Sequence, residues 1–262
     1  SLVLFGGILS SILGPGIAFL TKDWVEGAPF MGSYQSLIGL YVVVFLLLQL
    51  VDLPKPTANE QQPRTRPFWE ITRQTTWKVS LLSAALGYAA MALIMTATPL
   101  SMQAYQHSFS ASAFVIQWHV IAMFMPSFFT GNLIQRFGGK NIMLVGIGLN
   151  LLCILINTQG QFFLSYWSAL ILLGVGWNFM FIAGTTLLTE TYRPEEKALV
   201  QGVNDVLVFG AAASGSLLAG VLQNQIGWET LNMVVAPPLL LLAGWLLWLK
   251  RGRGILVQQP IH

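Results

Sequence analysis

The sequence predicts an all-α polytopic membrane protein. Hydrophobic residues make up 55% of the 262 residues and charged residues only 9%, and the mean hydropathy is +0.66. A soluble domain carries about 25% charged residues, so we expect most of this surface to meet lipid rather than water. The apolar runs are about 20 residues long and do not alternate with polar residues, which favours membrane-spanning helices over a β-barrel.

Eight apolar segments are long enough to cross a bilayer as helices. They are residues 2–20, 30–51, 79–98, 112–130, 141–156, 162–188, 198–222 and 231–249. Between the second and third lies a long polar stretch, residues 52–78, which has no apolar periodicity before Phe68 and is predicted to be a linker. Phe68, Trp69 and Ile71 stand among charges and could lie along the membrane surface.

The cations predict how the chain crosses the membrane. Twelve of the thirteen Lys and Arg residues lie in residues 52–78, 131–141, 190–197 and 250–253, and Lys22 is the exception. Loops rich in Lys and Arg stay in the cytoplasm. We therefore expect a multi-pass protein of the inner membrane with both ends of this chain cytoplasmic. Because the cations lie in these loops, the net charge of +3 does not indicate a nucleic-acid partner.

The sequence offers little for metal or redox chemistry. Cys153 is the one cysteine, which excludes a disulfide framework or a cysteine-based metal site. Neither His107 nor His119 has a histidine or carboxylate at ligand spacing, so both are expected to face solvent or to pack. The chain begins without a charged signal-peptide region and opens inside an apolar span, which suggests a fragment. No metal or cofactor is expected.

Two stretches carry a family resemblance. Residues 131–144 read G-N-L-I-Q-R-F-G-G-K-N-I-M-L and are predicted to form a hydrophilic turn between two spans. This turn resembles motif A of the major facilitator superfamily, G-x-L-x-D-R-x-G-R-K/R, although Gln135 replaces its Asp and Gly139 replaces one cation. In the first span, Gly14 and Pro15 resemble the G-P of that family's motif C, although Ala18 and Phe19 replace its final glycines. Ordinary small-residue helix packing is the alternative reading of this second stretch.

The resemblance implies helices 5 to 12 of a twelve-helix transporter. Residues 1–52 would be the last two helices of the N-terminal bundle, 53–78 the cytoplasmic linker, 79–250 the C-terminal six-helix bundle and 251–262 the cytoplasmic tail. The family's activity is secondary active transport of a small solute by alternating access. Here it is expected to be proton-coupled, in a monomer embedded in the lipid bilayer, with uptake and efflux both open.

Two other classes of function compete with transport. A non-transporting sensor or assembly protein on the same scaffold remains the alternative. An enzyme is not expected, because the sequence contains no H-E-x-x-H, no P-loop and no G-x-S-x-G.

Four side chains near the middle of predicted spans are candidate substrate contacts: Tyr88, Met95, Trp118 and Asn178. Polar groups at this depth are costly without partners, and methionine adapts to varied ligands. Asn178 weighs most, because a substrate or a bound water could supply the partner that its amide needs. Gln117 is the rotational alternative to Trp118, since neighbours on a helix cannot both face one cavity.

Four charged residues are candidates for gating or coupling: Arg136, Lys140, Glu190 and Asp205. The resemblance to motif A implies that Arg136 helps to close the cytoplasmic side, and Glu190 is its expected partner. Asp205 is the one carboxylate within a predicted span. It is either a proton-coupling group or a structural one tied to Gln201 and Asn204.

Overall fold

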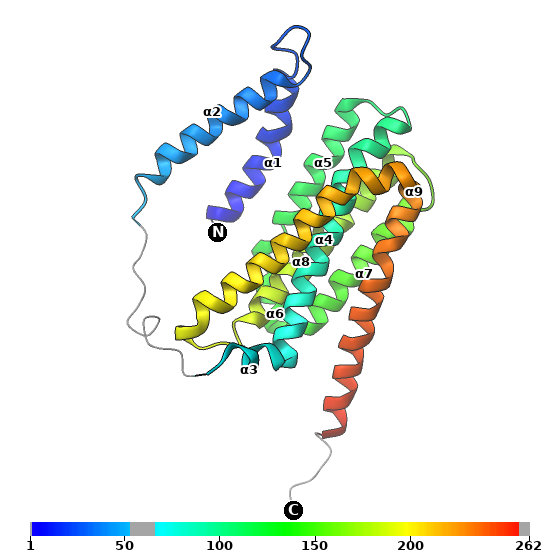
Figure 1. The fold of residues 1–262 in the computed structure, drawn as a ribbon. Helices are drawn as coiled ribbons and strands as arrows, with labels where there is room; N and C mark the ends of the chain where they lie inside the picture. Colours follow the sequence, from blue (N-terminus) through cyan, green and yellow to red (C-terminus); the bar gives the residue numbers. More distant parts are fainter. Residues whose placement is uncertain (1, 53–65, 257–262) are drawn as a thin grey trace, which may run out of the picture.

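The computed structural model describes residues 2–52 and 66–256, and helices are the only regular structure in these two stretches (Figure 1). The elements are α1 (Leu2–Thr21), α2 (Met31–Leu48), α3 (Phe68–Arg73), α4 (Thr75–Ala104), α5 (Phe109–Phe124), α6 (Ser127–Phe137), α7 (Gly139–Asn157), α8 (Phe163–Leu188), a 3-10 turn (Pro194–Glu196) and α9 (Lys197–Leu256). Half of the expected linker (residues 53–65) and the end of the expected tail (residues 257–262) lie outside the described residues. The predicted all-α membrane class is confirmed.

Most of the expected spans appear as long apolar helices, and one of them is interrupted by a bend. Among the described residues, five helices are long and apolar enough to cross a membrane, or six if the bent pair α5–α6 is one span. This pair bends by 43° at Pro126, because proline donates no backbone hydrogen bond and its ring clashes with the preceding turn. α9 contains two expected spans, since its backbone reverses at Gly227, where φ is 75°.

Two predicted boundaries are wrong. The expected hydrophilic turn over residues 131–141 is mostly helix, because α6 continues to Phe137 and the chain turns into α7 at Gly138, with φ 82°. Glycine tolerates this left-handed backbone where a side chain would clash. The linker also ends earlier than expected: α4 begins at Thr75 rather than at residue 79.

Helices α4 to α9, called the main bundle below, enclose a large apolar core. Its fully buried side chains include Ile94, Val115, Met143, Ile147, Leu173, Met180 and Leu246. Glycines let the helices approach closely. A Cβ added to Gly146 of α7 would lie 2.8 Å from the carbonyl oxygen of Gly176 in α8, and one added to Gly215 of α9 would lie 2.7 Å from the carbonyl oxygen of Ala89 in α4.

These contacts predict different effects for two glycines of the same helix. Gly146→Ala should lower the free energy of unfolding by about 1–3 kcal/mol, because backbone atoms of α8 would have to move. Gly148 has nothing within 4 Å of an added Cβ, so Gly148→Ala should be neutral or stabilise by up to about 1 kcal/mol through helix propensity. Unfolding of both variants in detergent measures the difference, and equal effects would contradict this packing.

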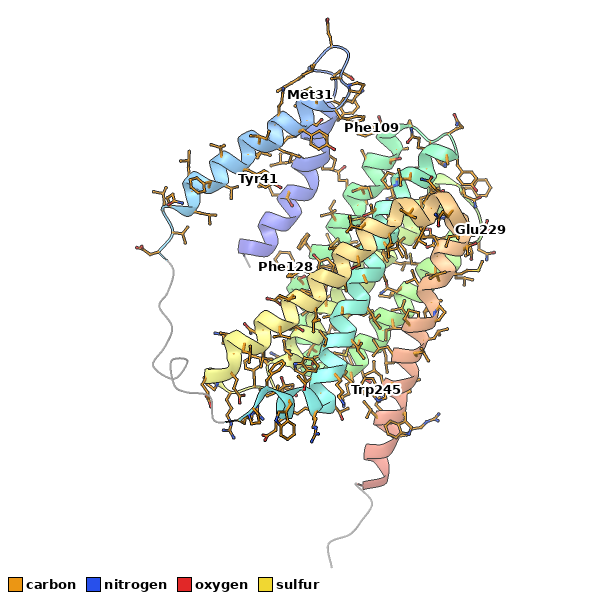
Figure 2. All side chains as sticks on the ribbon, in the orientation of Figure 1. Met31, Tyr41, Phe109, Phe128, Glu229 and Trp245 are labelled. Carbon is orange, nitrogen blue, oxygen red and sulfur yellow. The ribbon has the colours of Figure 1, made fainter. Side chains whose placement is uncertain are left out.

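The α1–α2 hairpin lies beside the main bundle and touches it through α5. A Cβ added to Gly7 would lie 2.8 Å from the Phe124 ring, and the rings of Phe30 and Phe109 lie 5.4 Å apart. α2 leaves most of its apolar side chains exposed, with Tyr41 72% exposed (Figure 2).

The two ends of the molecule differ in charge. One end carries α3, both ends of α9 and the α6–α7 turn, with Arg66, Arg136, Lys140 and Lys250, and is called the cation-rich end below. The connections α1–α2, α4–α5 and α7–α8 lie at the opposite end (Figure 1).

Candidate functional site

Five aromatic rings from four helices meet on the main bundle and are called the aromatic cluster below. They are Tyr88 of α4, Phe124 of α5, Trp177 and Phe181 of α8, and Phe209 of α9. The Tyr88 ring meets those of Trp177, Phe181 and Phe209 edge-on at centroid distances of 5.2, 5.6 and 5.5 Å. Trp177 and Phe181 are stacked, with centroids 5.1 Å apart and planes 9° apart.

The helices place this cluster on the side of the main bundle that faces the hairpin. Trp177 and Phe181 are four residues apart in α8, so they share one helix face. The Phe124 ring lies 6.3 Å from the Trp177 ring and also touches α1 at Gly7. The aromatic cluster therefore lies close to the boundary between the hairpin and the main bundle.

Two polar groups of the cluster have no hydrogen-bond partner among the described residues. The Trp177 side chain is 5% exposed, and its indole Nε1 is buried and unpaired. The Tyr88 hydroxyl, on a half-buried side chain, also makes no hydrogen bond within the described chain. Buried donors without partners are costly. The cluster therefore combines aromatic rings with an unpaired donor, the two kinds of group that a flat heteroaromatic solute would contact.

Asn178 does not join this cluster, and the expectation that its amide needs a substrate or a water as a partner is wrong. Its Oδ1 accepts a hydrogen bond from Thr130 Oγ1 at 2.7 Å, and its Nδ2 donates to the Met123 carbonyl oxygen at 2.7 Å and to Ser127 Oγ at 2.5 Å. The amide is thus satisfied inside the main bundle. It bonds groups on both sides of Pro126, where the bend interrupts the regular helix hydrogen bonds.

Of the other predicted contacts, Tyr88 alone lies in the cluster. Trp118 is 39% exposed and packs against Phe114 and Trp167, at centroid distances of 6.1 and 6.0 Å. Met95 packs against the core of the main bundle. The other four rings were not among the predicted contacts, although the four-residue spacing of Trp177 and Phe181 is a sequence signal for two of them.

A second group of polar contacts lies at the cation-rich end and is called the Arg66 clamp below. Arg66 donates from Nε to Glu196 Oε1 at 2.6 Å, and from Nη2 to Glu196 Oε2 at 2.8 Å and to the Thr191 carbonyl oxygen at 2.7 Å. Gln74 Nε2 donates to the same carbonyl at 3.0 Å. The clamp ties the residues before α3 to the junction of α8 and α9.

The clamp changes the electrostatics of a buried carboxylate. The Glu196 side chain is 0% exposed. The hydrogen bond from Arg66 lowers the pKa of its carboxyl group, helped by the backbone N–H of Arg193 and opposed by burial. The same hydrogen bond raises the pKa of Arg66. No sequence pattern pairs Glu196 with Arg66, because the two residues lie 130 positions apart.

The predicted pair of Arg136 and Glu190 is not formed. Both residues are exposed, and within the described residues no ion pair joins them. The Arg136 guanidinium instead lies 5.2 Å from the centroid of the Phe137 ring. The carboxylate that does bind a guanidinium at this end is Glu196.

The remaining candidates lie apart from the cluster. Lys140 lines a groove at the cation-rich end with Asn141 and Lys250, and Lys250 Nζ donates to Asn141 Oδ1 at 2.7 Å. Asp205 is exposed on α9, and its Oδ1 accepts from Asn204 Nδ2 at 3.2 Å. The expected tie to Gln201 is absent, because Gln201 Nε2 donates to the Tyr192 hydroxyl at 2.6 Å.

The motif C-like pair lies in α1. An added Cβ at Gly14 would meet nothing within 4 Å, and Pro15 lines a cavity at the opposite end. His119 is fully buried, with Nδ1 2.7 Å from the Leu170 carbonyl oxygen.

Comparison with known proteins decides the family. The family model described as Major Facilitator Superfamily matches residues 1–215 and, in a second placement, residues 80–255. The chain belongs to the major facilitator superfamily. Transporters of this superfamily are membrane proteins with small-molecule substrates, in agreement with the apolar helices of this chain.

Named members of the superfamily are similar to most of this chain. The riboflavin transporter RfnT of Brucella anthropi is 39% identical over 239 residues, which cover 90% of this chain and 60% of that protein. The uncharacterized MFS-type transporter YdeG of Bacillus subtilis is 31% identical, over 93% of this chain and 60% of its own length. The tetracenomycin C resistance and export protein of Streptomyces glaucescens is 26% identical, over 60% of this chain and 30% of its own length. The chain thus spans about three fifths of the first two relatives.

Proposed function

We propose that this protein is a secondary active transporter that carries a small, flat aromatic solute across the inner membrane by alternating access. In this proposal α1 and α2 belong to the N-terminal bundle, α4 to α9 form the C-terminal bundle, and the cation-rich end is cytoplasmic. The solute passes between the bundles, where transporters of this kind bind their substrates. The observation that carries the proposal is the aromatic cluster, with its unpaired indole N–H, beside the α1–α5 contact.

The chemistry of the cluster favours a heteroaromatic solute. Aromatic rings attract other flat π-systems by stacking and edge contacts, and the Trp177 N–H suits a carbonyl oxygen or a ring nitrogen as acceptor. Riboflavin has a flat ring system with both kinds of acceptor, and the relative at 39% identity is named a riboflavin transporter. Riboflavin is therefore the solute that we propose. The names of the relatives above favour a transporter over the sensor or assembly protein that the sequence left open.

Transport by the full-length protein in proteoliposomes tests this proposal. Radiolabelled riboflavin placed inside or outside the vesicles should cross the membrane saturably, and excess unlabelled riboflavin should compete. Vesicles without protein, and vesicles loaded with a labelled sugar, are the controls. If riboflavin moves in neither direction faster than in protein-free vesicles, the proposed substrate is wrong.

Proton coupling is proposed through Asp205. This carboxylate lies on α9 within an expected span, is exposed on the main bundle, and forms no ion pair among the described residues. Asp205→Asn keeps the size of the side chain but cannot exchange a proton. It should abolish the extra accumulation of riboflavin that a pH gradient drives, while exchange of riboflavin for riboflavin continues.

The matched control is Glu190→Gln, which removes an exposed carboxylate at the cation-rich end. This variant should respond to the pH gradient as the wild type does. Gradient-driven accumulation that survives in Asp205→Asn would exclude this residue as the coupling group.

A further inference from the structure

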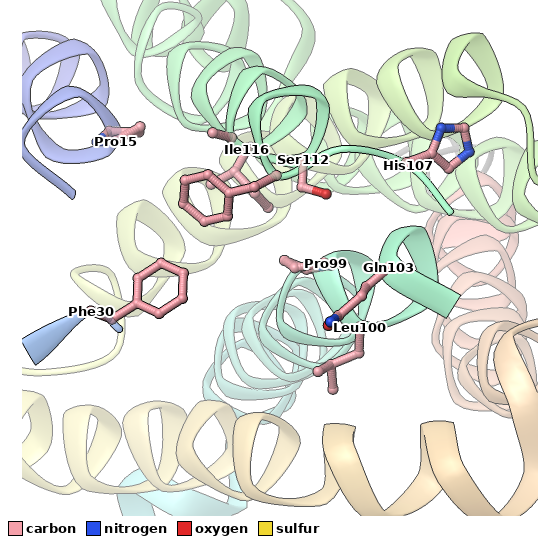
Figure 3. Close-up of a pocket in the computed structure, with 10 residues that line it drawn as sticks. Pro15, Phe30, Pro99, Leu100, Gln103, His107, Ser112 and Ile116 are labelled. Carbon is pink, nitrogen blue, oxygen red and sulfur yellow. The ribbon is translucent and has the colours of Figure 1, made fainter. Parts of the chain in front are cut away.

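A cavity of about 610 Å³ lies between the α1–α2 hairpin and the ends of α4 and α5 (Figure 3). Pro15 and Phe30 line it on the hairpin side, and Gln103, His107 and Ser112 on the side of the main bundle. It lies toward the opposite end of the molecule from the Arg66 clamp. Its volume falls within the range of about 300–1,000 Å³ that is typical of small-molecule sites.

The polar side chains of this cavity are an amide, a hydroxyl and an imidazole, and they are incompletely paired. The Gln103 amide and the Ser112 hydroxyl make no hydrogen bond with the described residues, although Ser112 is only 7% exposed. His107 Nε2 lies 2.8 Å from the Gln161 carbonyl oxygen, and its Nδ1 has no partner in the described chain. No Asp, Glu, Lys or Arg is among the described residues that line the cavity. Such a site favours hydroxyl or amide groups over ions.

The cavity also has two aromatic side chains, Phe30 from the hairpin and Phe109 from α5. The rings of Phe30 and Phe109 lie 5.4 Å apart. Phe30 has φ 66°, which is rare for a bulky residue, and its N–H donates to the Lys22 carbonyl oxygen at 2.7 Å. Strained residues of this kind cluster at functional sites. Here this backbone conformation places the Phe30 ring at the wall of the cavity.

We propose that this cavity is a second binding site on the solute's path, specific for a neutral compound that joins a flat aromatic ring to a hydroxyl-bearing chain. The ring packs against Phe30 and Phe109, and the hydroxyl groups bond Gln103, Ser112 and His107. The proposal rests on the proposed function, because riboflavin has this combination of a flat ring and a polyhydroxyl chain. The aromatic cluster offers no comparable set of neutral polar side chains, so the cavity is the part of the path that recognises the chain.

Protection of a cysteine tests binding at the cavity separately from transport. In the full-length protein without other cysteines, Gln103→Cys is alkylated by a maleimide in the presence and absence of riboflavin. Saturating riboflavin should slow this reaction several-fold, whereas ribitol, which has the chain without the ring, should protect much less. The matched control is Ser110→Cys, an exposed position on α5 outside the cavity lining, whose alkylation riboflavin should not change.

Transport kinetics give the second readout. Gln103→Leu removes the amide and should raise the KM for riboflavin roughly fivefold, the effect of one neutral hydrogen bond, with little change in kcat. Gln159→Leu, at an exposed loop position outside the cavity, should leave KM unchanged.

The outcomes separate the two proposals. If riboflavin is transported but neither protects Gln103→Cys nor depends on Gln103, the cavity is not a binding site and the proposed function stands. If riboflavin protects the cysteine but is not transported, the cavity binds it and the proposed function fails. If it does neither, both are overturned.

Discussion

Trp177→Ala is expected to lower kcat/KM for riboflavin transport roughly 30- to 1,000-fold, from the loss of one stacking contact and one hydrogen bond. Trp177→Phe keeps an aromatic ring but removes the N–H, and should cost roughly tenfold. Because truncating a buried tryptophan also costs about 3–5 kcal/mol of stability, the amount of folded protein in the membrane is measured beside transport. The Phe variant provides the milder test.

Trp167 offers a matched control for this prediction. It lies on the same helix, α8, and its indole N–H is also buried without a partner, but it contacts Trp118 instead of the aromatic cluster. Trp167→Phe should therefore leave KM and kcat close to those of the wild type. Equal losses in the two Phe variants would show a general packing effect and would remove the cluster from the solute's path.

Arg66→Ala is expected to have a large effect on stability. It leaves the fully buried carboxylate of Glu196 without its cation, and breaking a buried ion pair in this way costs about 3–5 kcal/mol. The free energy of unfolding in detergent near neutral pH measures this loss. Arg73→Ala is the control, because Arg73 is exposed and lies over the Trp69 ring; it should cost about 1 kcal/mol or less. Equal losses would show that the clamp does not stabilise the junction.

The clamp also predicts a pH dependence. The folded-state pKa of Glu196 is below its ordinary value, so its contribution is present above the unfolded-state pKa of about 4.3 and is lost as the pH falls through the folded-state pKa. The stability difference between wild type and Arg66→Ala should therefore be constant near neutral pH and shrink in acid. A constant difference down to pH values well below about 4 would contradict the assigned pairing.

The sequence predicted the helices better than their ends. Long apolar runs identify spans because the bilayer sets their length, and α1, α2, α7 and α8 lie close to the expected ranges. The bend at Pro126 was missed because apolar runs on both sides of a proline read as one span. Gly131 was expected to begin a turn, but a glycine can also continue a helix, and Gly131 lies inside α6.

The candidate site was only partly predictable from the sequence. Asn178 and Trp177 are neighbours on α8, and a helix turns by about 100° at each residue, so the two side chains point in different directions. Because the sequence does not show how α8 is rotated about its axis, the polar Asn178 was the predicted solute contact and not the aromatic Trp177. Tyr88 was predicted and lies in the cluster. The Arg66 clamp joins residues 130 positions apart, and Phe30 and Phe109 meet across two helices; such contacts follow from tertiary packing, which periodicity does not reveal.

The claim that the aromatic cluster binds the solute is tested most directly by the fluorescence of riboflavin bound to the purified full-length protein. A flavin stacked on tryptophan loses its fluorescence, so titration with wild-type protein should quench it saturably. Trp167→Phe should quench to the same extent, and Trp177→Phe should remove most of the quenching while riboflavin still binds weakly. Undiminished quenching in Trp177→Phe would contradict the claim that the aromatic cluster binds the solute.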